Sequence, residues 1–255
     1  MANDVLLLDI GNTCCKWALQ QDGVFVPGGE FAHAGQIDSE QLTQINLDHS
    51  PAKIAAVCVA GDKLVESLQA QIQHRFGKQV ELISTPYKGQ GISVAYVQPT
   101  QLGSDRWAAM VAAHQRWPGY MCVVDAGSAL TLDIIHPDGQ HQGGYILPGL
   151  RMMQNCLLEK TAIPTSSQAV KFASSTEPGS NTASCIANGI LQAACGIIER
   201  TVMQLRQDAK GTVQCVLTGG DSQCLAAELN VPHVVEANLV LLGLAQIVSD
   251  RTKMA

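Results

Sequence analysis

The chain has 255 residues, of which 46% are hydrophobic and 15% charged, and its formal net charge at pH 7 is −6. This composition is typical of a globular protein and excludes an intrinsically disordered chain. No apolar run approaches the roughly 18–20 residues that a membrane span requires, and no cluster of lysine and arginine suggests nucleic acid as a partner. A chain of this length forms one large domain or two domains of about 120–130 residues.

The chain begins with a hairpin pattern that occurs twice. Residues 5–23 align without a gap on residues 121–139, at a constant offset of 116. In both segments an apolar run ends in Asp-x-Gly and a small polar turn, and a second apolar stretch leads to Asp-Gly, a strong hairpin signal. The matched residues are Asp9 with Asp125, Gly11 with Gly127, Asn12 with Ser128, and Asp22-Gly23 with Asp138-Gly139. Such turns present backbone N–H groups and a carboxylate, which suit a phosphate and its metal ion. Two of them predict duplicated halves that face each other across a nucleotide cleft.

The rest of the first half reads as strand, helix, strand, loop and helix. Residues 54–60 have the pattern of a buried strand, 63–76 that of an amphipathic helix, and 80–85 that of a further strand. Glycine and proline in 86–106 predict a long loop, which is a common place for a binding site. Helical periodicity returns at 106–117.

The second half has the same alternation of strands and helices. The predicted elements are strands at 121–125 and 129–135, a helix of about 150–160 introduced by Pro148-Gly149, a polar segment at 164–182, a helix of about 183–207, a strand at 213–222 that runs into a Gly-Gly turn, and a last helix in 237–250. This alternation predicts the α/β class. With a boundary near 117–120, the expected domains are an N-terminal half of 1–118 and a C-terminal half of 119–255.

Nine cysteines without a C-x-x-C pair indicate neither a disulfide framework nor a zinc site. Most of them lie in apolar stretches and are predicted to be reduced core residues, namely Cys58, Cys122, Cys185, Cys195 and Cys215. Cys14 and Cys15 differ because they lie beside the first phosphate turn, although they could simply be strand residues on opposite faces. Reduced thiols, together with an N-terminus that lacks a basic export signal, predict a cytoplasmic protein.

Seven short motifs follow one another along almost the whole chain. They are DIGNTCCK at 9–16, GSDRW at 103–107, DAGSALTLD at 125–133, GGYILPGL at 143–150, SNT at 180–182, LTGGDS at 217–222 and NLVLLGL at 238–244. In this order and spacing the chain resembles the type III pantothenate kinases of the acetate and sugar kinase, heat-shock ATPase and actin superfamily. The resemblance implies two duplicated actin-like (ribonuclease H-like) halves. Two departures are Ser128, where threonine is usual, and CIANG at 185–189; serine keeps the hydroxyl, so we expect at most a change of affinity.

The implied activity is ATP-dependent phosphorylation of pantothenate, the first step toward coenzyme A. Phosphoryl transfer needs a positioned alcohol, a carboxylate to accept its proton, and donors or cations that spread the developing charge. Asp105 fits the proton acceptor, and Arg106 could bind the pantothenate carboxylate through two hydrogen bonds. On residue types alone, the two could equally be a surface pair that caps the helix at 106–117.

The resemblance also implies which residues bind each ligand. The residues expected at ATP are Asp9, Ile10, Gly11, Asn12, Thr13, Cys14, Cys15, Lys16 and Ser128. Those expected at pantothenate are Tyr96, Gly103, Ser104, Asp105, Arg106 and Thr182, with Thr182 reaching over from the other subunit of a homodimer. Asp9 is expected to position the Mg²⁺ that ATP carries and Asp125 to hold K⁺ or NH₄⁺, while Gly219 and Gly220 let the backbone approach the adenosine.

Residue types alone leave simpler alternatives at several of these positions. Tyr96 could be a packed strand aromatic, Lys16 a solvated strand residue, and Gly219-Gly220 a tight turn. Asp125 and Ser128 could merely stabilise their own turn.

Other functions have distinguishable consequences. A sugar or acetate kinase would keep both phosphate turns but lack the GSDR loop with SNT downstream. A phosphohydrolase of the same superfamily would release phosphate without pantothenate, and a non-catalytic regulator would bind ligands without turnover.

Overall fold

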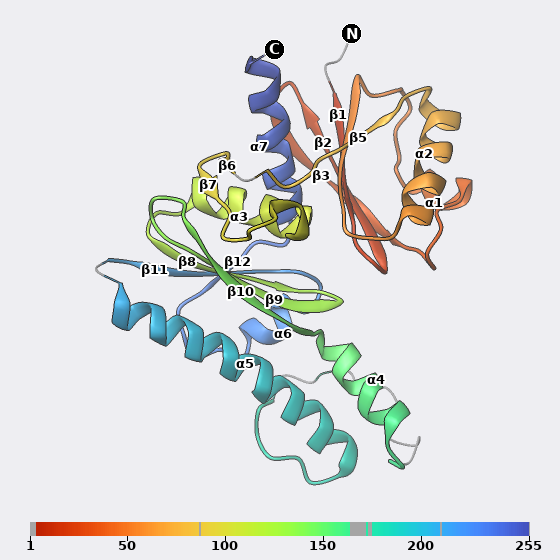
Figure 1. Cartoon of the computed structure of the whole chain (residues 1–255). Helices are drawn as coiled ribbons and strands as arrows, with labels where there is room; N and C mark the ends of the chain where they lie inside the picture. The colour runs from red at the N-terminus through yellow and green to blue at the C-terminus, as the bar shows by residue number, and fades with distance from the viewer. Residues whose placement is uncertain (1–3, 87, 164–171, 173–174, 210, 255) are drawn as a thin grey trace. The chain divides into compact units, whose positions relative to one another are not determined.

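The fold is that of a computed structural model, which describes residues 4–86, 88–163, 172, 175–209 and 211–254. The chain divides into two compact units, one of residues 1–112 with 238–255 and one of residues 113–237 (Figure 1). Within the described part of the chain, none of the helices combines the length and the apolar character that a membrane crossing would need.

Five strands form the sheet of the first unit, in the order β3-β2-β1-β4-β5. They are β1 (Val5–Ile10), β2 (Cys14–Gln21), β3 (Val24–Ala32), β4 (Lys53–Cys58) and β5 (Val80–Leu82). β1 pairs antiparallel with β2 and parallel with β4. The turn between β2 and β3 is Asp22-Gly23, with φ of 49° and 83°. Two consecutive positive φ values favour Asp-Gly and give the tight hairpin that the sequence predicts.

Helices cover both faces of this sheet, which is why β1 is apolar almost throughout. The unit contains α1 (Ser39–Thr43), α2 (Asp62–Phe76), η1 (Pro99–Gln101), most of α3 (Ser104–Arg116), α7 (Leu239–Met254) and the short pair β6 (Lys88–Gly89) and β7 (Ile92–Ser93). Leu6, Leu8 and Ile10 pack in one core cluster with α2. α7 lies on the opposite face of the sheet, against β1, β2 and β4 (Figure 1).

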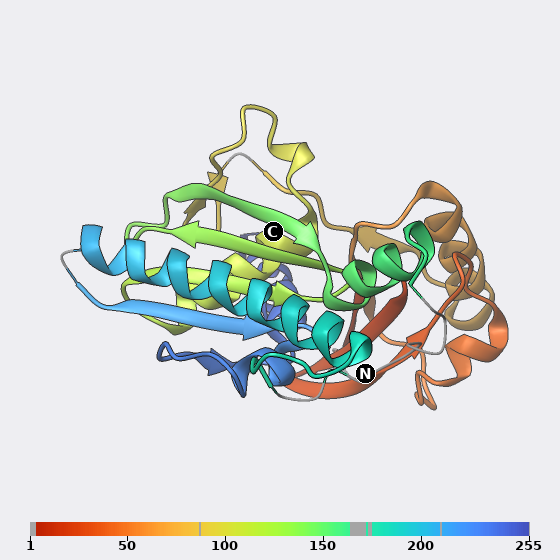
Figure 2. The same cartoon turned by 90° about the horizontal axis from the view of Figure 1, so that it is seen from below.

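The second unit repeats the same strand order as β10-β9-β8-β11-β12. Its strands are β8 (Tyr120–Ala126), β9 (Ala129–Ile135), β10 (His141–Pro148), β11 (Val213–Thr218) and β12 (Val234–Val235), and its helices are α4 (Leu150–Lys160), α5 (Thr182–Asp208) and α6 (Ser222–Ala226). α5 lies across one face of this sheet (Figure 2), where Leu191, Ala194 and Ile198 join Val124 and Leu132 in the core. Two copies of one mixed five-stranded arrangement confirm the predicted α/β class and its duplicated halves.

The two hairpins correspond less simply than their gapless alignment suggests. In the first turn the Gly11 N–H donates to the carbonyl of Cys14, whereas in the second the Gly127 N–H donates to the carbonyl of Ala129, so the second turn is one residue shorter. The next turn in the second unit, which includes Asp138-Gly139, is one residue longer than Asp22-Gly23. Because one turn is a residue shorter and the next a residue longer, the two sequences still align without a gap.

The compact units differ from the predicted halves in the position of the last helix. Halves of 1–118 and 119–255 stay a proposal for the domains, while in the structure α7 groups with the first unit. Gly243 makes this packing possible, because a side chain there would collide with the backbone of Ala108 on α3.

The remaining elements follow the predictions closely, apart from short or glycine-rich ones. The predicted helix of about 183–207 is α5, and Pro148-Gly149 directly precedes α4 as expected. Of the polar segment 164–182, residues 164–171 and 173–174 lie outside the described residues. β3 and β10 lie outside the strands predicted from the sequence, and both contain adjacent glycines, which weaken the local signal of a strand: Gly28-Gly29 and Gly143-Gly144.

All nine cysteines are free thiols. Cys122, Cys195 and Cys215 are core residues as predicted, and Cys58 is half-buried. The prediction for Cys185 is wrong, because this residue is exposed near the start of α5.

Candidate active site

The first phosphate turn lies between β1 and β2. Asp9 is the penultimate residue of β1 and pairs with Lys16 of β2, so their side chains lie on the same face of the sheet. Asn12 and Thr13 are exposed at the tip of the turn. A carboxylate, an ammonium group and an exposed tip are therefore held next to one another by strand pairing alone.

The start of α3 is attached to the strand beside this turn. The Ser104 hydroxyl accepts from the Cys58 N–H at 3.2 Å and lies 3.4 Å from the Cys58 carbonyl. Cys58 ends β4, and the following Val59 N–H donates to the Ile10 carbonyl at 3.2 Å. The predicted substrate loop thus ends beside the first phosphate turn.

The charges of three carboxylates act on the Cys58 thiol. Burial raises the pKa of this thiol, its hydrogen bond to Ala60 lowers it, and the negative charges of Asp9, Asp105 and Asp62 raise it further. Asp9 and Asp105 therefore act on one group within the first unit. Strand register and hydrogen bonding place both beside Cys58, because Ile10, next to Asp9, pairs with Cys58, and Ser104, next to Asp105, is hydrogen-bonded to it.

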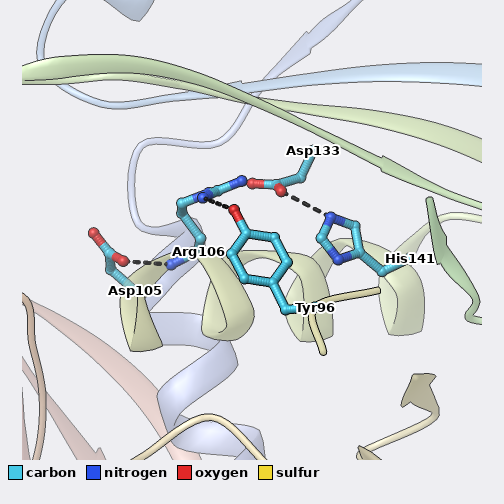
Figure 3. Close-up of polar contacts among 5 residues, drawn as sticks. All are labelled: Tyr96, Asp105, Arg106, Asp133 and His141. Atoms are coloured by element: carbon cyan, nitrogen blue, oxygen red, sulfur yellow. Dashed lines mark hydrogen bonds and ion pairs between the residues drawn. The ribbon is translucent and has the colours of Figure 1, made fainter. Parts of the chain in front are cut away.

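Asp105 has a fixed orientation at the beginning of α3. Its Oδ1 accepts from the Arg106 N–H at 2.7 Å (Figure 3). Gly103 is needed there, since a Cβ on it would lie 2.5 Å from that oxygen and 3.2 Å from Cγ1 of Val59. The carboxylate is also at the positive end of the helix dipole, which favours its ionised form.

Arg106 and Tyr96 form the adjoining part of the site. Nη1 of Arg106 donates to the Tyr96 hydroxyl at 3.2 Å, and the guanidinium carbon is 5.9 Å from the ring centroid (Figure 3). Arg106 is only 7% exposed. A surface Asp-Arg pair is therefore the wrong description of Asp105 and Arg106. A buried guanidinium of this kind suits an anionic group of a ligand.

The second turn has its own close-packed geometry. Asp125 is the penultimate residue of β8 and pairs with Thr218 of β11. Gly219 has a φ of 90°, and a Cβ on it would lie 2.5 Å from Oδ1 of Asp125. Ser128 is half-buried in the turn. The conformation of this turn therefore requires glycine at position 219. Gly220 is exposed, with open space around it.

Thr182 is exposed as the first residue of α5. Asn181 caps the helix, with its side chain accepting from the Ser184 N–H at 3.0 Å. The departures at 185–189 attach the preceding loop to the helix, because the Cys185 thiol lies 3.2 Å from the Gly179 carbonyl and the Asn188 amide donates to the Glu177 carbonyl at 2.7 Å.

The two cysteines beside the first turn offer little chemistry of their own. Burial, then the charge of Glu30, raise the pKa of the half-buried Cys14 thiol. Cys15 is fully buried in the first core, and burial raises its pKa as well. Both thiols stay protonated at neutral pH, so a contact of Cys15 with ATP would come from its backbone.

The described residues contain no group of three histidine, cysteine or acidic side chains that could hold a metal ion by itself. A single carboxylate such as Asp9 beside a phosphate turn fits Mg²⁺, which is usually held by one or two carboxylates, substrate phosphates and water.

Three polar groups of the structure were not predicted from the sequence. Asp133 and His141 form a buried pair, Oδ1 to Nε2 3.0 Å (Figure 3), and a Cβ on the neighbouring Gly144 would lie 2.9 Å from that oxygen. The second group is Asp221, whose pKa is raised by burial and lowered by the charge of Arg151.

The third group is His33, which lines a cavity of about 380 Å³ together with Asn12 and the start of α2. Asp133 lies within the DAGSALTLD motif, whereas the contacts of His33 and His141 depend on strand pairing.

Solved structures with a similar fold define the class of protein. A glucokinase of Balamuthia mandrillaris in complex with glucose has a TM-score of 0.51 at 11% identity, covering 97% of this chain and 94% of that one. A conserved protein of Campylobacter jejuni, provisionally assigned to the Baf family of transcriptional activators, has a TM-score of 0.59 at 25% identity, covering 97% and 99%. The chain thus has the duplicated actin-like fold that sugar kinases also have.

Sequence relatives narrow this class to one family. The family model for type III pantothenate kinase matches residues 5–204. A type III pantothenate kinase of Herminiimonas arsenicoxydans is 38% identical over 251 residues, covering 94% of this chain and 95% of that protein. One of Nitrosococcus oceani is 34% identical over 264 residues, covering 98% and 96%. The chain belongs to the type III pantothenate kinase family.

Proposed function

We propose that this kinase transfers the γ-phosphoryl group of ATP to the terminal hydroxyl of pantothenate, giving 4′-phosphopantothenate and ADP in the first step of coenzyme A biosynthesis. One observation carries the proposal beyond family membership: Ser104 attaches the start of α3 to the end of β4. This places the carboxylate of Asp105 and the buried guanidinium of Arg106 at the loop beside the first phosphate turn.

In the proposed reaction, the hydroxyl oxygen of pantothenate attacks the γ-phosphorus of ATP. The bond from that phosphorus to the bridging oxygen breaks, ADP leaves with the electron pair, and Asp105 accepts the hydroxyl proton. Arg106, with Tyr96 beside it, binds the pantothenate carboxylate and orients the alcohol. The N–H groups of Gly103 and Ser104 complete the substrate loop.

The ATP phosphates bind at the two turns. Residues 9–16 contribute backbone N–H groups, the hydroxyl of Thr13 and the ammonium of Lys16, and Ser128 contributes its hydroxyl from the second turn. Mg²⁺ arrives with ATP next to Asp9 and supplies charge neutralisation at the phosphates.

Asp125 is proposed as the ligand of a monovalent cation, K⁺ or NH₄⁺. Its Oδ1 lies between the backbones of Gly127 and Gly219, where a Cβ would lie 3.5 and 2.5 Å from that oxygen, and a carboxylate oxygen is a suitable ligand for a hard cation. Activity should then require K⁺ or NH₄⁺, with Na⁺ a poor substitute. Equal activity of the wild type in Na⁺ alone would remove this assignment.

The active unit is proposed to be a homodimer in which Thr182 completes the partner's pantothenate site. Exposed apolar side chains on β10 and α4, elements that contact each other, support an association surface on the second unit: Tyr145, Met152 and Leu157. The nine free thiols support a reducing compartment, the cytoplasm.

Product analysis tests the proposed reaction. The purified protein is incubated with ATP, Mg²⁺, K⁺ and pantothenate, and mass spectrometry identifies the phosphorylated acceptor. 4′-Phosphopantothenate should form, and with Asp105→Asn it should form about 10²–10⁴-fold more slowly. Phosphorylation of a sugar or acetate instead, with no product from pantothenate, would refute the proposal.

A further inference from the structure

His33 follows β3 directly and contacts the first phosphate turn twice. Its backbone N–H donates to the Thr13 carbonyl at 3.1 Å, which continues the β2–β3 ladder by one residue. Its ring Nε2 is 3.0 Å from the Gly11 carbonyl oxygen, and the residue is only 9% exposed. The carbonyls of two turn residues are thus held by one histidine.

The tautomer of His33 follows from its partners. A carbonyl oxygen can only accept, so Nε2 must carry the proton that reaches Gly11. Nδ1 is 3.3 Å from the Gly35 N–H, which can only donate, so Nδ1 must be the acceptor. Gly35 has a φ of 85°, a backbone conformation that favours glycine. The ring is therefore held at both nitrogens.

The second phosphate turn provides an internal comparison. Gly149 follows β10 as His33 follows β3, and its N–H donates to the Ser128 carbonyl at 3.1 Å. Its backbone lies so close to the Gly127 carbonyl that a side chain would collide with it. The residue after the third strand of each sheet therefore supports the phosphate turn. In the second unit, Gly149 does so by its backbone alone, and in the first unit His33 does so by its backbone and its imidazole ring.

We infer that His33 is a positioning residue for ATP: it holds the Gly11 and Thr13 carbonyls toward β3, so that the N–H groups at the tip of the turn face the phosphates. Carbonyl oxygens turned toward a phosphate would repel it, and the turn contains glycine, which does not fix its own orientation. This inference rests on the proposed function, because it takes the first turn as the ATP site.

Three variants separate the contact to Gly11 from the rest of the side chain. His33→Gln keeps a donor at about the reach of Nε2, His33→Asn keeps an acceptor near Nδ1 but no donor that reaches Gly11, and His33→Leu keeps neither. His74→Gln, an exposed change on α2, is the matched control. The measurements are the Kd of ATP with Mg²⁺ by calorimetry, KM for both substrates, and Tm.

The expected result is a Kd and KM for ATP about 3- to 10-fold higher in the Leu and Asn variants, the effect of one lost hydrogen bond. KM for pantothenate should stay unchanged, and the Gln variant should be close to wild type. Equal ATP affinity in all variants would overturn the inference. So would a loss in the Gln variant as large as in the Leu variant, or a parallel rise of both KM values with a lower Tm, since these indicate general structural damage.

The wild type distinguishes this inference from the proposed function. If it binds ATP but does not phosphorylate pantothenate, the function is wrong while the Kd series still decides the role of His33. If it does not bind ATP at all, both are wrong.

Discussion

Asp105 combines three features at one residue. It lies in the first turn of α3, its carboxylate accepts from the Arg106 N–H, and it is close enough to Cys58 to raise the pKa of that thiol. In the proposed reaction, a carboxylate held in this way would accept the proton without reorganisation of the loop.

Asp105→Asn should lower kcat by about 10²–10⁴-fold, the range for the loss of a general base. The Kd of ATP should change little, because the phosphate turn is untouched. Asp62→Asn is the matched control, as Asp62 is an exposed acidic residue in the first turn of α2. Near-normal turnover of a folded Asp105→Asn protein would exclude Asp105 as the base.

Asp221 should make stability depend on pH. Burial raises its pKa above the ordinary value of 3.8, so ionisation costs folding free energy as the pH rises through the raised value. Asp221→Asn should therefore raise Tm at neutral pH, and the gain should disappear at pH values below about 4. Thermal unfolding at both pH values measures this, with the exposed Asp48→Asn as control. A gain that is equal at both pH values would contradict the burial argument.

Residues that share a short motif could be predicted from the sequence, whereas residues joined by strand pairing could not. Gly103, Ser104, Asp105 and Arg106 are consecutive, so their proximity follows from the loop itself. His33 contacts Gly11 across 22 positions of the chain, and that contact exists only because β3 returns alongside β2.

The two hairpins are the elements that position the candidate site. Their strands were predicted from apolar runs and Asp-Gly turns, both of which are local signals. Their unequal turn lengths could not be predicted, because the two one-residue differences cancel in the alignment. β3 and β10 were missed for a related reason: adjacent glycines weaken the local signal of a strand, and only pairing with β2 and β9 makes these segments strands.

Substitution by alanine should destabilise the protein at Gly219 but not at Gly220. Gly219→Ala combines a positive φ with a collision at the Ala126 carbonyl and the Asp125 carboxylate, so it should lower the free energy of unfolding by about 2–4 kcal/mol. Gly220→Ala enters open space and should change it by less than about 0.5 kcal/mol. Chemical denaturation measures both. Equal effects would mean that the close approach to Asp125 does not exist in solution.

For the whole molecule, the duplicated fold followed from the sequence, but the assignment of the last helix did not. Residues 239–254 follow the second half along the chain, yet they pack on the first sheet. Nothing local in their apolar sequence indicates which sheet they cover.

The shared site of the proposed homodimer can be tested by complementation. Asp105→Asn and Thr182→Trp proteins should each be inactive and, when mixed, recover about a quarter of wild-type activity, because each mixed dimer has one site with neither lesion. Thr182 is exposed on α5, so the bulky variant should fold. Full activity of a monomer, or no recovery despite demonstrated subunit exchange, would reject the shared site.

The most direct test of the central claim is the rate of ADP release by the purified wild type with ATP, Mg²⁺ and K⁺, with and without pantothenate. The account predicts release that depends on pantothenate, with ADP and 4′-phosphopantothenate formed in equal amounts. The same rate of ADP release without pantothenate would indicate a hydrolase and contradict it.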